Sequence, residues 1–184
     1  MKKTIISAFF IVIFSALKAQ IPTVKPLNVG LEKNYQNFSS KKETVIQKEI
    51  IKLGDFKDLH FQKIVLKDLS DDSTLSVLGI MTLSETFDNI SRKTITLEKD
   101  EVEKLINALE KIQQNSSSKT ENDTKYKYTT KSGIETGSNY HADLKTWEYY
   151  LKLPATFYSQ NEIQFSQNEL AELIKFLKTA NHKL

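Results

Sequence analysis

Two stretches of the chain repeat the same order of apolar and polar positions at an offset of 68 residues. Each opens with two alternating apolar residues, as in a half-buried strand, and continues with apolar residues at i, i+3, i+4 and i+7. The stripes consist of Val102, Leu105, Ile106 and Leu109 in the first copy and Leu170, Leu173, Ile174 and Leu177 in the second. The pattern therefore predicts, twice, a short strand leading into an amphipathic helix with one face on a core.

The residues that begin the two helices differ. In the second copy, Ser166 and Glu169 have the spacing of a capping box, in which serine accepts from a first-turn amide and glutamate reaches back. In the first copy, Glu98 stands at the capping position, where its charge favours the helix dipole. Both helices are thus predicted to begin directly after their strand.

Upstream of each helix the pattern predicts strands separated by turn residues. In the first half the expected strands are Val45–Leu53, ended by Gly54 and Asp55, then Leu59–Leu69, Leu75–Leu83 and the segment around Ile95, with turns at Asp71–Ser73 and Asp88–Asn89. In the second half they are Thr124–Lys131, Ile134–His141, Leu144–Leu153 and the segment around Ile163, with Pro154 ending the third. Short links between strands imply antiparallel pairing.

The predicted fold class is therefore α+β: tandem duplicated ββββα units forming two antiparallel sheets with a helix each. The expected boundaries are a signal peptide over 1–19, a poorly ordered lead-in over 20–42, a first half over 43–114, a polar loop over 115–123 and a second half over 124–184. We expect the two halves to form one compact domain.

The N-terminus carries an export pattern. Lys2 and Lys3 precede thirteen uncharged residues, Ile5–Leu17, and a small residue, Ala19, follows. This order is typical of a secretory signal peptide, and the apolar run is too short to span a bilayer. We expect cleavage near Ala19 and a soluble protein in the periplasm or outside the cell, without a membrane anchor.

Charge and cysteine content narrow the function. The chain has 26 basic and 23 acidic residues, and the predicted signal removes Lys2, Lys3 and Lys18, leaving 23 of each sign. A neutral mature chain gives no general support for binding nucleic acid or an anionic membrane. The chain has no cysteine, so no disulfide stabilises it and no lipid can be attached to a cysteine after the signal.

Aromatic residues cluster in the second half. Six of the seven tyrosines and the only tryptophan fall between positions 126 and 158. The candidate ligand-binding residues are Tyr126, Tyr128, Tyr140, Trp147, Tyr149 and Tyr150. One interpretation is cross-strand packing, and the other is an exposed aromatic platform for a glycan, a peptide or a protein. Because Tyr149 and Tyr150 are adjacent in a strand, they are expected to face opposite sides of the sheet.

No motif nominates a catalytic or metal centre. The three histidines, His60, His141 and His182, lack ligand spacing, and there is no nucleophile elbow and no glycine-rich phosphate loop. Asp143 and Glu148 lie in the aromatic segment and keep open the alternative of a carboxylate-dependent enzyme that acts on an extracellular polymer. We expect no metal and no cofactor.

The order of elements resembles the Whirly-type fold, in which two antiparallel sheets splay from a pair of helices. That resemblance implies single-stranded DNA binding, which export and neutral charge disfavour. The segments Lys131–Gly137 and Trp147–Leu153 also resemble a group of small exported bacterial proteins with no assigned activity. We therefore expect a non-catalytic binding or interaction module of the bacterial envelope or exterior, with self-association through sheet edges as a further alternative.

Overall fold

A computed structural model describes residues 33–86, 89–154 and 162–184 of the chain. The predicted signal peptide, the first part of the lead-in, the turn residue Asp88 and the aromatic residue Tyr158 lie outside the described residues. None of the helices in the described ranges is both long enough and apolar enough to cross a membrane.

The first half begins with a short helix and continues with four strands and a long helix. Its elements are α1 (Lys33–Ser39), β1 (Ile46–Phe56), β2 (Leu59–Asp68), β3 (Thr74–Thr86), β4 (Asn89–Leu97) and α2 (Lys99–Asn115). The second half contains β5 (Thr124–Thr129), β6 (Glu135–His141), β7 (Thr146–Lys152), β8 (Glu162–Phe165) and α3 (Gln167–Lys183). The predicted α+β fold with tandem ββββα units is confirmed.

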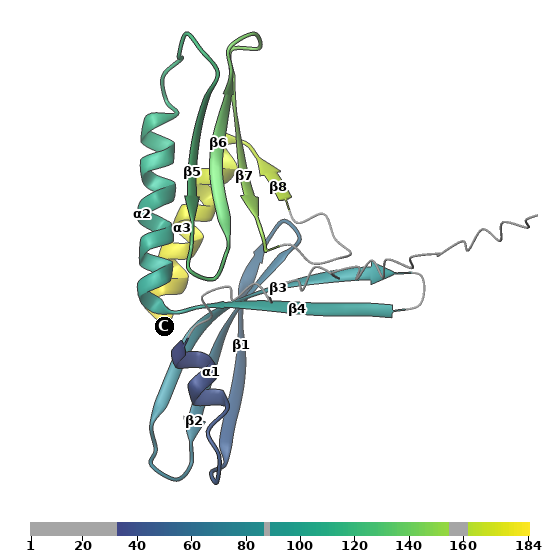
Figure 1. Cartoon of the computed structure of the whole chain (residues 1–184), viewed down its shortest axis with the longest axis vertical. Coiled ribbons are helices and arrows are strands. Elements are labelled where there is room, and N and C mark those ends of the chain that lie inside the picture. The colour runs from purple at the N-terminus through teal and green to yellow at the C-terminus, as the bar shows by residue number, and fades with distance from the viewer. Residues whose placement is uncertain (1–32, 87–88, 155–161) are drawn as a thin grey trace, which may run out of the picture.

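Each half builds its own antiparallel sheet. The first sheet has the order β1-β2-β3-β4 and the second has the order β5-β6-β7-β8, so neighbours in the sequence are neighbours in the sheet. In Figure 1 the helices α2 and α3 run side by side, and the second sheet lies along them. The first sheet fans out from the lower end of the helix pair. The two sheets therefore leave the helix pair in different directions.

A single core joins the two halves. The apolar stripes of both helices are buried, as their spacing of i, i+3, i+4 and i+7 predicted, and they pack against residues from both sheets. Sheet residues in this core include Leu59, Phe61, Leu78, Ile80 and Leu97 from the first half and Tyr149, Leu151, Leu153 and Phe165 from the second. Leu105 and Leu173 are fully buried, so truncating either to alanine would cost about 2–5 kcal/mol.

The halves also dock on each other through equivalent turns. The β5–β6 turn of the second half contacts the start of α2, where the Glu101 carboxylate accepts from the Ser132 amide at 2.7 Å and from its hydroxyl at 2.6 Å. The β1–β2 turn of the first half contacts the start of α3, where Lys57 pairs with Glu169 at 2.8 Å. Each half thus places its first hairpin turn on the other half's helix.

These reciprocal turn contacts give the two equivalent glutamates of the repeat different roles. Glu101 and Glu169 are equivalent in the repeat, yet only Glu169 completes the predicted capping box with Ser166. In the first half, Glu98 occupies the N-cap without a side-chain cap bond, and its carboxylate accepts from Asn34 of α1 instead. Glu101 is consequently free of capping and serves the contact between halves.

The structure differs from the sequence prediction at the end of β1. Gly54 was expected to end the strand, but β1 continues to Phe56 through a bulge between Lys52 and Gly54. Gly54 adopts a φ of 152°, and an added Cβ would lie 2.8 Å from the ring of Phe176. The glycine therefore marks a bulge under a helix side chain, because only a residue without a Cβ fits there.

The segment expected as a poorly ordered lead-in contains α1 in its described part. Tyr35 and Phe38 of this helix pack on Ile64, Leu66 and Val77, which point to the face of the first sheet opposite α2 and α3. β2 carries apolar residues on both of its faces, and α1 covers the face that points away from α2 and α3. The sequence pattern of α1 is too short to reveal a helix by periodicity.

Candidate functional site

The six aromatic candidates lie on the second sheet, and none of them is exposed. Tyr140, Tyr149 and Tyr150 are buried, while Tyr126, Tyr128 and Trp147 are half-buried and pack against the main core. The register places Tyr126, Trp147 and Tyr149 on the face that α2 and α3 cover, and Tyr150 on the other face. Tyr149 and Tyr150 thus face opposite sides, as strand alternation predicted.

Trp147 sits in the middle of a cross-strand aromatic stack. Its ring lies 5.6 Å from that of Tyr126 at an interplanar angle of 16°, and 5.0 Å from that of Tyr140. Its indole N–H donates to the carbonyl of Ser118 at 3.0 Å, which ties the loop after α2 to the sheet. These contacts give the stack the cross-strand packing role that the sequence left as one alternative.

Tyr150 is buried on the outer face by neighbouring strands. It lies opposite Gly137, its hydroxyl donates to Glu135 at 3.2 Å, and the Lys125 ammonium lies 5.3 Å from its ring centroid. Burial, with the nearby Glu135 carboxylate, raises the pKa of Tyr150 to about 12. The ring fills the space that the missing Cβ of Gly137 leaves, so it stabilises the sheet rather than offering a surface.

The titratable candidates do not gather into a centre. His60 contacts Asp55 at 2.7 Å and His141 contacts Glu148 at 3.4 Å, at separate places on the surface. Within 33–86, 89–154 and 162–184, no three histidine or acidic side chains form a group that could hold a metal ion. Asp143 is exposed in the β6–β7 turn, with Glu148 further along β7.

A recess lies where the first sheet, α1 and the second half meet. We call it the junction recess; its volume is about 390 Å³. The residues that line it are Tyr35, Gln36, Lys48, Ile64, Lys93, Thr94, Ile95, Thr96, Ser132 and Pro154. Both halves of the molecule contribute walls, and its mixture of apolar, hydroxyl and charged groups is typical of a ligand site of this size.

The described lining of the junction recess is positively charged. Lys48 of β1 and Lys93 of β4 line it, and its described lining contains no aspartate or glutamate. The Lys93 ammonium donates to the Pro154 carbonyl at 3.3 Å, and neither lysine pairs with a carboxylate of the described residues. Partial burial lowers the pKa of Lys93 because the ammonium is partly removed from water.

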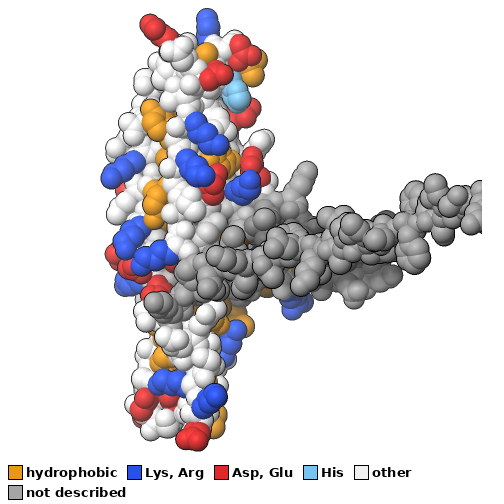
Figure 2. Space-filling model, viewed as in Figure 1, with side chains coloured by type: hydrophobic (Ala, Val, Ile, Leu, Met, Phe, Trp, Pro, Cys, Tyr) orange, Lys and Arg blue, Asp and Glu red, His pale blue; other side chains and the backbone are white. Residues whose placement is uncertain are grey.

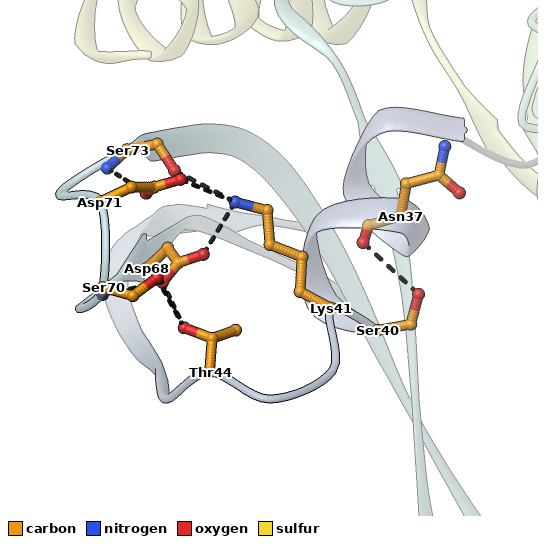
Figure 3. A network of polar contacts seen from close by, with 8 residues as sticks. All are labelled: Asn37, Ser40, Lys41, Thr44, Asp68, Ser70, Asp71 and Ser73. Carbon is orange, nitrogen blue, oxygen red and sulfur yellow. Dashed lines mark hydrogen bonds and ion pairs between the residues drawn. The ribbon is translucent and has the colours of Figure 1, made fainter.

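A polar network secures the end of α1, which forms one wall of the recess. As Figure 3 shows, Lys41 reaches from the segment after α1 to the β2–β3 turn, where it pairs with Asp68 at 2.8 Å and Asp71 at 3.3 Å. Asp68 also accepts from Thr44 and Ser70, and these bonds, with that of Lys41 largest, hold its pKa well below its usual range. The network therefore fixes α1 by charge-assisted bonds.

Another edge of the recess holds Ser132, whose hydroxyl donates to the Glu101 carboxylate. Ser132 is 2% exposed, and Glu101, its acceptor, is 3% exposed. One oxygen of Glu101 accepts both the hydroxyl and the amide of Ser132, so the carboxylate holds the whole turn. This arrangement stabilises the contact between the halves; it does not present the hydroxyl for attack on a substrate.

The chain matches no family model, no curated protein and no solved structure. The resemblance to the Whirly-type fold therefore stays a prediction from the order of elements. What the fold and the site define is a class: a duplicated α+β protein with a charged recess between its halves.

Sequence reasoning missed the recess. Its lining comes from α1, three strands of the first sheet and two positions of the second half, which are separated by up to 119 residues, from Tyr35 to Pro154. Of these positions, only Ile95 and Pro154 entered the sequence analysis by name, as part of a predicted strand and as the predicted end of another. No local signal marks Lys48 or Lys93 among the other lysines of the chain.

Proposed function

We propose that the protein is a non-catalytic binding module of the bacterial envelope or exterior, and that its ligand occupies the junction recess. The observation that carries the proposal is a recess of about 390 Å³ that both halves line, with two lysines and no described carboxylate. The export pattern at the N-terminus supports the location.

The alternatives have less support. An enzyme acting through paired carboxylates requires two acidic groups in one recess, and the described lining of the junction recess holds none. A protein that binds nucleic acid is expected to have a positively charged surface. Figure 2 instead shows blue and red side chains intermixed on the visible face of the protein. Self-association would use the edge strand β1, where Ile50 and Ile51 are 55% and 41% exposed.

A fragment screen by NMR tests the proposal. A library of small organic acids and neutral analogues is titrated into the protein, and the perturbed amide signals are mapped. We expect the hits to cluster at residues around the recess, such as Tyr35, Ile64 and Thr94. Hits confined to the hollow between α2 and α3, which Glu103 and Lys178 line, would contradict the proposal.

A pair of neighbouring variants supplies the control. Gln36→Trp places an indole at the mouth of the recess, because Gln36 is a lining residue with an exposed side chain. Asn37→Trp adds the same ring at the next position of α1, which does not line the recess. Binding should fall in the first variant and persist in the second; equal binding in both would place the ligand elsewhere.

A further inference from the structure

The junction recess runs along the edge of the first sheet. Four consecutive residues of β4, from Lys93 to Thr96, line it. Successive strand residues point to opposite faces, so a recess that lay over one face would meet only alternate residues. β4 is the last strand of the first sheet, with β3 as its one strand partner among the described residues. The recess therefore follows the outer edge of β4.

The main chain at this edge is directed into the recess. The Thr96 carbonyl accepts from the Ser132 hydroxyl at 3.3 Å, so it points away from β3 and toward the second half. In an antiparallel strand, the N–H and C=O groups of every second residue point to the same side. Thr94, whose side chain is exposed, consequently directs its N–H and C=O outward in the same way.

An outward-facing edge and the partly buried Lys93 together specify the partner. We propose that the ligand of the junction recess is an extended acidic peptide segment, which pairs with β4 at Thr94 and places its carboxylates on the face of the sheet that carries Lys93. Strand addition supplies main-chain hydrogen bonds, and the charges select the sequence. An acidic strand also supplies the neutralising charge that the partly buried Lys93 lacks within the described residues. This inference rests on the proposed function.

Three synthetic peptides separate the two recognition elements. The probe is a capped pentapeptide in which valine and glutamate alternate, so that all its carboxylates lie on one side of the strand. The first control replaces glutamate by glutamine, and the second carries N-methyl groups on the backbone. We expect calorimetric titration to show binding of the probe that weakens with salt, and a loss of about tenfold or more with each control.

Variants of the protein test the same contacts from the other side. Thr94→Pro removes the outward N–H, and because that group does not bond β3, the variant should keep its unfolding midpoint and lose peptide binding. Thr94→Val keeps the N–H and should bind normally. Lys93→Met should weaken binding of the acidic probe by about tenfold without changing binding of the glutamine peptide. Lys125→Met, on the outer face of the second sheet, is the matched control.

The outcomes are distinct. If Thr94→Pro unfolds the sheet, the N–H points to β3 and the inference is wrong. If the peptides do not bind while small organic acids perturb the recess, the proposed function stands and the peptide inference falls. If neither binds, both fall. If the glutamine and glutamate peptides bind equally, Lys93 does not select the partner and the acidic class is overturned.

Discussion

Removing the Glu101 carboxylate tests whether the two halves depend on their reciprocal turns. In Glu101→Ala, the amide and the hydroxyl of Ser132 both lose an acceptor in a site where Ser132 is 2% exposed. The hydroxyl can turn fully to the Thr96 carbonyl, which already lies 3.3 Å away. The amide has no such substitute and is left buried without its bond.

The magnitude follows from these bonds. A hydrogen bond to a charged group contributes about 1.5–3 kcal/mol, and an orphaned buried donor costs a similar amount. Since one of the two donors recovers a partner, we expect Glu101→Ala to lower the free energy of unfolding by about 3 kcal/mol. The matched control on the same helix is Glu110→Ala, which breaks the partly exposed pair with Lys178 and should cost under about 1 kcal/mol.

Urea unfolding of four proteins measures the effect: wild type, Glu101→Ala, Ser132→Ala and the double variant. The cycle isolates the Glu101–Ser132 interaction, for which we expect a coupling of about 1.5–3 kcal/mol. The reasoning is refuted if Glu101→Ala costs no more than Glu110→Ala, or if the two single effects simply add. Either result would mean that the turn docks without the carboxylate.

Three further predictions concern the sheets and α1. Gly137→Ala should lower the free energy of unfolding by about 3 kcal/mol in the same assay, because the added Cβ meets the carbonyl oxygen of Tyr126 and lies 2.7 Å from the Tyr150 hydroxyl; a wild-type midpoint would contradict this packing. Because the pKa of Tyr150 is raised to about 12, its contribution to stability should persist up to about pH 10 and disappear as the pH approaches 12. Ultraviolet titration should show a late tyrosine that Tyr150→Phe removes, and an unchanged titration curve would refute it. Lys41→Met should speed amide exchange in α1 while α2 stays protected, because it removes the ammonium that joins α1 to Asp68; equal protection of α1 would show that the network does not hold the helix.

The fold was accessible from the sequence because its periodic elements are long and repeated. The stripes at Leu105 and Leu173 predicted both helices, and the serine–glutamate spacing at Ser166 predicted the cap that the structure contains. Strand order followed from short turns. The error at Gly54 arose because a glycine signals a turn and a bulge alike, and only the helix residue above it decides between them.

The candidate site was not accessible in the same way. Aromatic clustering at Trp147 was a visible signal, but the structure places that ring in cross-strand packing, a use that strands commonly make of aromatics. The junction recess depends on how the halves meet. Lys93 is one of many lysines in the sequence, and its place beside Pro154 arises from tertiary packing alone.

One measurement tests the central claim, that the junction recess rather than the aromatic sheet is the binding surface. The alternating valine–glutamate peptide is titrated into isotope-labelled protein while two NMR signals are followed together: the amide of Thr94 and the indole N–H of Trp147. The indole signal is unambiguous because the chain has one tryptophan. Our account predicts that the Thr94 signal moves and saturates while the indole, held on Ser118, stays in place. Movement of the indole with an unchanged Thr94 would contradict the account and assign binding to the aromatic stack.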